Sequence, residues 1–257
     1  MKKQTILLVL AAFLFSIACQ LLTPSNREGT IISACTDAVQ AFRAVQPGAV
    51  PQSLLETGVK QGGEFDVNDY FNAFAHISME DGYALDYVYQ LDSLGSFPIL
   101  YARPADQPAY ASTEDLPADT EISSYLDHIL IDDTEQGYFE FVALDIMARQ
   151  FYLDWHANYN DTEIVCDKKA VNEIIADIND GSFGAPFDAS QQLQARTLTD
   201  IEPLVKLTDD SAVVEIITFT KWGGFYRLTY TINRSFPHTI LDVQTENLVE
   251  YDCGIVF

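Results

Sequence analysis

Basic side chains are scarce in this sequence of 257 residues, which has 14 lysines and arginines against 38 aspartates and glutamates. The acids are scattered rather than run together, and 48% of the residues are hydrophobic, so we expect a globular body with a sizeable core. An acidic surface of this kind repels nucleic-acid phosphates and anionic lipid headgroups alike. We therefore expect no nucleic-acid partner.

The signatures of common catalytic and cofactor sites are also missing. The sequence has no G-x-S-x-G, H-E-x-x-H or S-x-x-K motif and no glycine-rich phosphate loop. Its four cysteines and four histidines show neither C-x-x-C nor H-x-x-x-H spacing, which disfavours a zinc site. We expect no cofactor and no metal, and an enzyme is the less favoured class of protein.

No apolar run is long enough to cross a membrane comfortably, because a spanning helix needs about 20 apolar residues. The N-terminal run, residues 6–18, carries no charge and follows Lys2 and Lys3. A positive start followed by a short apolar stretch is the layout of a signal peptide. An ordinary secretory signal and an uncleaved anchor are two of the forms that such a segment can take.

The end of this run, Ser16-Ile17-Ala18-Cys19, resembles the lipobox of bacterial lipoproteins, although that family more often has leucine where Ser16 stands. The resemblance covers the first 19 residues only. It implies cleavage of residues 1–18 and a diacylglycerol on the sulfur of Cys19, which supplies the two acyl chains that stable anchoring requires. Residues 19–31 would then be a lipidated tether, and residues 32–257 an extracytoplasmic domain held at the membrane, with the bilayer as partner through Cys19.

Lipidation of Cys19 would leave Cys35, Cys166 and Cys253 as thiols in an oxidising compartment, where a disulfide is favoured. Three thiols allow three pairings and leave one cysteine over. Cys166 and Cys253 each end an apolar, strand-like segment. We predict that these two are joined.

The hydrophobic periodicity predicts an α+β fold, mostly antiparallel sheet in hairpins and meanders, with about three helices. Short connections favour antiparallel pairing, because parallel strands need a longer crossover. The proline-containing segment 104–117 could divide the domain into two subdomains. The expected helices are 33–46, 66–77 and 167–179, and the expected strands are 83–91, 97–101, 138–147, 151–159, 162–166, 212–220, 225–232 and 239–243.

The stretch FYLDWHANYND, residues 151–161, most resembles a site. Read as a strand, it places Asp154 and His156 next to each other on one face, which is the kind of pair that acid–base chemistry uses. The opposite face, with Trp155, would pack inward. A solvent-facing strand with mixed polar side chains needs no function to explain it. The polar row consists of Tyr152, Asp154, His156 and Asn158.

A second candidate is TKWGGFYR, residues 220–227, which places Lys221, Trp222 and Arg227 around a turn. Such an island could stack on a sugar or hold an anionic group, or it could be a hairpin whose aromatic rings cover the sheet. Two functions therefore remain open. We expect a non-catalytic binding or assembly module for an unknown protein or small-molecule partner, and the alternative is an extracytoplasmic hydrolase that uses Asp154 and His156.

Overall fold

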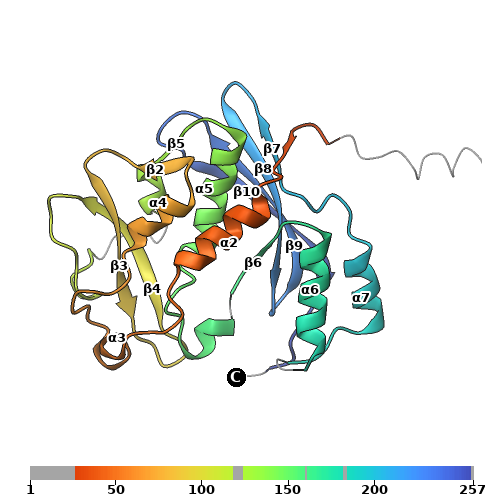
Figure 1. Ribbon diagram of the computed structural model, residues 1–257, viewed down its shortest axis with the longest axis horizontal. Coiled ribbons are helices and arrows are strands. Elements are labelled where there is room, and N and C mark those ends of the chain that lie inside the picture. Colours follow the sequence, from red (N-terminus) through yellow and green to blue (C-terminus); the bar gives the residue numbers. More distant parts are fainter. Residues whose placement is uncertain (1–26, 118–123, 160, 182–183, 256–257) are drawn as a thin grey trace, which may run out of the picture.

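The computed structural model describes residues 27–117, 124–159, 161–181 and 184–255 (Figure 1). The expected signal peptide and Cys19 lie outside the described residues. Within these ranges helices pack against antiparallel sheets, which confirms the α+β class. None of the helices in this part of the chain is long and apolar enough to span a bilayer.

Six antiparallel strands form the main sheet. Their order is β1-β7-β8-β9-β10, and β6 pairs with the part of β8 that β7 does not reach. The turn predicted within residues 220–227 contains Gly223 and Gly224 and joins β8 to β9. Gly224 has a φ of 90°, and a Cβ there would lie 2.0 Å from the carbonyl oxygen of Val249. The strands are β1 (Thr30–Ile31), β6 (Glu163–Val165), β7 (Leu204–Leu207), β8 (Ser211–Thr220), β9 (Gly224–Asn233) and β10 (Ile240–Glu250).

Two smaller ribbons, β2–β5 and β3–β4, lie with α2, α3 and α4 on one side of the molecule, and α6 and α7 lie on the other (Figure 1). The ribbons consist of β2 (Ile77–Met79) with β5 (Ile129–Ile131), and β3 (Tyr83–Gln90) with β4 (Phe97–Pro104). The helices are α2 (Cys35–Val45), α3 (Gln52–Thr57), α4 (Tyr70–Ala73), α5 (Glu135–Met147), α6 (Lys168–Asn179) and α7 (Ala189–Arg196), and the 3-10 turns are η1 (Val67–Asp69), η2 (Ser124–His128) and η3 (Trp155–Tyr159).

Buried apolar side chains gather in two clusters. The larger one lies around α5 and includes stacked rings, with centroids 4.2 Å apart for Phe42 and Tyr70 and 4.5 Å apart for Phe42 and Phe74. The smaller one packs α6 and α7 against strands β8 to β10 and includes Phe219 and Phe225. Stacked and edge-on aromatic pairs of this kind add to the stability gained by burial.

Helix α6 begins and ends close to the predicted limits. The carboxylate of Asp167 accepts a hydrogen bond from the backbone nitrogen of Ala170 at 2.8 Å, which satisfies one of the free N–H groups of the first turn. Its apolar stripe, Val171, Ile174, Ile175 and Ile178, is buried. The predicted helix 66–77 is shorter than expected: η1 and α4 end at Ala73, and Ile77 already belongs to β2.

The segment 138–147, predicted as a strand, is the helix α5. Thr134 caps it by accepting a hydrogen bond from the backbone nitrogen of Gly137 at 3.1 Å. The prediction was wrong because almost every side chain of this helix is buried, including Tyr138, Phe139 and Phe141. A helix that is apolar on all sides has no polar face to reveal its period, and its aromatic and β-branched residues imitate a strand.

The segment 151–159 is a turn followed by η3 and not the predicted strand. Tyr152 and Trp155 have φ values of 51° and 54°, in the left-handed region that strands exclude. Trp155 is 61% exposed and does not pack inward as expected. The segment is held instead by the backbone of Asp154, whose nitrogen donates to the carbonyl of Ser96 at 3.0 Å.

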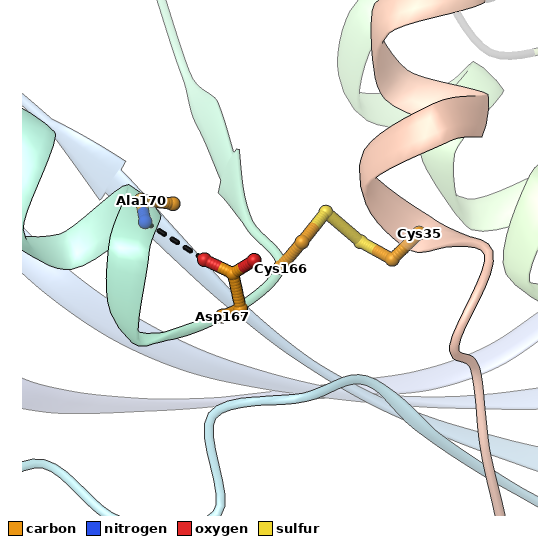
Figure 2. Close-up of a disulfide and its surroundings, with 4 residues drawn as sticks. All are labelled: Cys35, Cys166, Asp167 and Ala170. Carbon is orange, nitrogen blue, oxygen red and sulfur yellow. Dashed lines mark hydrogen bonds between the residues drawn. A yellow bond between two sulfur atoms is a disulfide. The ribbon is translucent and has the colours of Figure 1, made fainter.

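The disulfide joins Cys35 to Cys166, with Cα atoms 5.6 Å apart (Figure 2). Cys253 is a buried free thiol. The predicted bond between Cys166 and Cys253 is therefore wrong. Cys166 directly follows β6, where Val165 pairs with Ile217 of β8, whereas the nitrogen of Cys253 bonds the carbonyl of Lys221 beyond the end of β8. Positions so separated along a strand are on the order of 15 Å apart, too far for the roughly 7 Å limit of a disulfide.

Candidate functional site

The polar row predicted on residues 152–158 is not formed. Tyr152 turns into the core, where its hydroxyl accepts a hydrogen bond from the backbone nitrogen of Phe65 at 3.3 Å. Asp154 pairs with the β3–β4 loop, and His156 lies in η3 with its ring centroid 4.8 Å from that of Trp155. Asn158 is also in η3, and its side chain lies outside the described part. The shared strand face that suggested acid–base chemistry is thus absent from this segment.

The basic and aromatic island at residues 220–227 is divided between different surroundings. Arg227 lies 3.6 Å from Glu246 and donates to the carbonyl of Thr199. Trp222 lines a hollow together with Tyr226, and neither Lys221 nor Arg227 belongs to that lining. Alternation along β9 explains the split between Tyr226 and Arg227, because neighbouring residues of a strand point to opposite faces.

A pocket of about 360 Å³, which we call the Asp86 pocket, lies beside the β3–β4 ribbon. It is assembled from the loop 60–68, from both strands of the ribbon and from residues 109–111. The backbone nitrogen of Lys60 donates to the carbonyl of Ala111 at 2.9 Å and thereby joins two of these segments. The side chains that matter for its chemistry are Lys60, Glu64, Phe65, Asp66, Asp86, Tyr87, Arg103 and Tyr110.

Two cations are fixed on one carboxylate in the wall of this pocket. Asp86 accepts from Lys60 Nζ at 2.6 Å and from Arg103 Nε at 2.9 Å, and the three side chains are only 13%, 12% and 20% exposed. Arg103 is held further by its Nη1, which donates to the carbonyl of Gln107 at 2.6 Å. Lys60 Nζ also lies 4.7 Å from the centroid of the Tyr87 ring, within range of a cation–π interaction. The result is a preorganised pair of positive charges.

The other two carboxylates of the Asp86 pocket are engaged by their own loop. The two oxygens of Glu64 accept from the backbone nitrogens of Gln61 and Gly62 at 2.6 and 2.8 Å. Burial opposes ionisation of Glu64, but these hydrogen bonds and the charge of Lys60 outweigh it and lower the pKa of that carboxyl. Asp66 accepts from the backbone nitrogen of Asn68 at 2.9 Å. Glu64 and Asp66 therefore hold the loop in shape through its backbone nitrogens. They do not occupy the N–H donors of Lys60 and Arg103 that Asp86 leaves over.

Aromatic rings complete the walls. Tyr87 is almost fully buried, and burial raises its pKa, so its hydroxyl stays protonated at any physiological pH. The hydroxyl of Tyr101 accepts a hydrogen bond from the backbone nitrogen of Tyr110 at 2.8 Å. This bond holds the segment 109–111, which carries the Tyr110 ring, against β4. Gly62 and Gly63 line the pocket and both have φ of 90°, a backbone conformation that glycine adopts without strain.

Sequence reasoning missed the Asp86 pocket because its three central charges lie far apart along the chain, at positions 60, 86 and 103. One signal was available. Asp86 is the only acid of the apolar segment YALDYVYQ, and Arg103 is the only base of the neighbouring FPILYARP. In the antiparallel hairpin these two residues lie diagonally opposite, since Asp86 pairs with Tyr101 and Ala84 pairs with Arg103.

Two of the four histidines, His76 and His128, lie at the ends of the β2–β5 ribbon. His76 Nδ1 is 2.7 Å from Asp132, and His128 Nδ1 is 2.8 Å from Glu80. Each strand therefore has a histidine just before it and an acid just after it, and the two cross-strand pairs close both ends of the ribbon. Both pairs are partly exposed, and a cross-strand contact that stabilises the ribbon is enough to account for them.

No group of three or more histidine, cysteine, aspartate or glutamate side chains in the described ranges could hold a metal ion. No protein-family model matches the chain, and the comparisons with curated proteins and with solved structures find no match either. Function must therefore be argued from the chemistry of the pockets.

Proposed function

We propose that this protein is a membrane-anchored extracytoplasmic lipoprotein that acts as a non-catalytic binding module. The Asp86 pocket is its ligand site, and the ligand is a small molecule with an anionic group. The observation that carries the proposal is the pair of cations, Lys60 and Arg103, held in place by the single carboxylate of Asp86.

Burying such a cluster is costly, because desolvation of the charges offsets much of their mutual attraction. An apolar filling would stabilise the ribbon at least as well, so a role in binding accounts better for the cluster. Arg103 Nε and Nη1 are both engaged, while Nη2 has no acceptor among the described residues. Lys60 has three donors and gives one to Asp86. A ligand carboxylate or phosphate would accept these remaining hydrogen bonds.

The aromatic walls indicate what the rest of the ligand resembles. Small-molecule sites are concave and mostly apolar, with a few placed polar groups that set orientation. Phe65, Tyr87 and Tyr110 provide such walls. The ligand is therefore a compact anion with an apolar or planar body, of a size that suits a pocket of about 360 Å³.

The position of the pocket suits a tethered module. The described chain begins beside β7, where β1 pairs with it, and α3, β3 and β4 lie at the opposite end of the molecule (Figure 1). A tether attached at Cys19 would hold the domain by the end remote from its ligand site. The hydrolase alternative depended on a strand face shared by Asp154 and His156, and that face does not form.

The anchor is tested by comparing the wild type with Cys19→Ala in cells fed a labelled fatty acid. The wild type should incorporate the label and partition into detergent, and the variant should do neither. Equal partitioning of the two would contradict the lipid anchor, and it would leave the pocket proposal to its own test.

The pocket is tested by isothermal titration calorimetry of the folded domain with phenyl phosphate and benzoate as probes and benzyl alcohol as the neutral analogue. Arg103→Gln and Lys60→Gln should each weaken binding of the anions at least tenfold, as expected for the loss of a charge-assisted hydrogen bond. Lys169→Gln is the matched control, because Lys169 is exposed on α6 and lies outside the pocket. Binding that is equal for the neutral analogue, or that is unchanged in Arg103→Gln, would refute the proposal.

A further inference from the structure

A second pocket, of about 380 Å³, lies at the end of the main sheet where β8 turns into β9. It is formed where the β8–β9 turn meets the end of β10 and the first turn of α7. We call it the aromatic turn pocket. Its lining consists of Gln191, Trp222, Gly223, Tyr226, Asn247, Glu250, Tyr251 and Asp252.

The walls of this pocket are fixed by hydrogen bonds to its own backbone. The side-chain nitrogen of Asn247 donates to the carbonyl of Gly223 at 2.9 Å, and that of Gln191 donates to the carbonyl of Glu250 at 2.9 Å. A Cβ on Gly223 would lie 2.1 Å from the hydroxyl oxygen of Tyr226, so this glycine allows the Tyr226 ring to lie against the turn.

Tyr251 anchors the aromatic side of the pocket to the core. Its hydroxyl donates to the carbonyl of Ala185 at 2.6 Å, and its ring centroid lies 4.5 Å from that of Phe187. Burial raises the pKa of Tyr251 to about 12, so its hydroxyl stays protonated and adds no charge to the pocket. Trp222 packs in part against the same apolar cluster.

The polar side of the aromatic turn pocket combines side-chain amides with acids. Asn247 and Gln191 each donate one amide N–H to a backbone carbonyl, and the amide oxygen of Asn247 is a further acceptor. The charged residues of the lining are Glu250 and Asp252, both exposed acids, and no basic side chain belongs to it. Aromatic faces beside carboxylates attract cations, most strongly when an organic cation loses part of its water against a tryptophan.

We propose that the aromatic turn pocket binds an organic ammonium group. Trp222 and Tyr226 supply π faces, and Glu250 and Asp252 supply the countercharge. The strongly acidic surface of the chain also raises the local concentration of cations, so binding weakens as salt screens this field. The two pockets thus favour ligand groups of opposite charge, and each proposal stands without the other.

Choline is the probe, and 3,3-dimethyl-1-butanol, which has the same shape without the charge, is its matched control. The chain has two tryptophans, so Trp155→Phe leaves Trp222 as the only indole that reports binding. Trp155 is exposed, and its replacement should leave the fold intact. Choline should change the emission of Trp222 in a saturable manner, and calorimetry with the wild type should give the same dissociation constant.

Glu250→Gln combined with Asp252→Asn should weaken choline binding at least tenfold, while Arg103→Gln in the other pocket should leave it unchanged. n-Butylammonium shows whether a primary ammonium, with N–H donors, binds more tightly than the quaternary ion, and tighter binding of either supports the proposal. Three results would overturn the proposal. The neutral alcohol could bind as tightly as choline, or methyl glucoside, the probe for a stacked sugar, could bind more tightly. The third result is that neither cation produces heat or a change of emission.

Discussion

Reduction of the Cys35–Cys166 disulfide should destabilise the domain by several kcal/mol. The bond closes a loop with a sequence separation of 131 residues. The chain-entropy relation for a loop of that length gives about 5 kcal/mol at room temperature, and measured values for native disulfides are typically about 2–4 kcal/mol. The bond ties the start of α2 to the junction of β6 and α6, so its loss releases two segments that are far apart in the sequence.

Urea unfolding followed by circular dichroism measures this loss. The Cys19→Ala chain should shift to a lower midpoint in reducing buffer, while a chain that also carries Cys35→Ala and Cys166→Ala should show the same midpoint in both buffers. When the oxidised Cys19→Ala chain is unfolded in urea, one thiol, that of Cys253, should react with a maleimide. Two results would refute the reasoning: a midpoint that does not respond to reduction, or a tryptic peptide that links Cys166 to Cys253.

Two further changes test other parts of the structure. Trp155→Ala should lower the free energy of unfolding in urea by less than about 1 kcal/mol, because the side chain is 61% exposed. Phe42→Ala should lower it by about 3–5 kcal/mol, because this ring is buried and stacked. Equal losses for the two variants would contradict the placement of Trp155. Burial opposes ionisation of Asp132, but hydrogen bonds from Thr134 and His76 outweigh it and lower the pKa of this carboxyl. The ionised carboxyl therefore adds to folding stability above its unfolded-state pKa of about 3.9, and this stability is lost as the pH falls further. Asp132→Asn should therefore lower stability at pH 7 by less than about 1 kcal/mol, since the pair is partly exposed. It should also flatten the decline of stability below about pH 4, and an unchanged decline would contradict the pairing.

Elements whose signals are local in sequence could be predicted. The stripe of α6 and its Asp167 cap lie within one helix, and the Gly223–Gly224 turn lies between two alternating segments, so periodicity and turn chemistry suffice for both. The β3–β4 hairpin follows the same logic, because its two strands are joined by a short loop.

The failures share a different cause, because each depends on contacts distant in sequence. Helix α5 has no polar face because other elements cover almost all of its surface, and this burial cannot be read from the segment alone. The disulfide partner of Cys166 follows from the place of β6 beside β8, which no local pattern records. The Asp86 pocket likewise forms only when the loop at Lys60 and the hairpin that carries Arg103 are brought together.

Native mass spectrometry of the protein, gently solubilised from membranes, tests the lipid-anchored binding module most directly. The predicted result is a chain that starts at Cys19 and carries a diacylglycerol, together with a non-covalent small anion that is lost from the Arg103→Gln variant and kept by the Lys169→Gln control. An unmodified Cys19, or the same adducts on the wild type and on Arg103→Gln, would contradict the account.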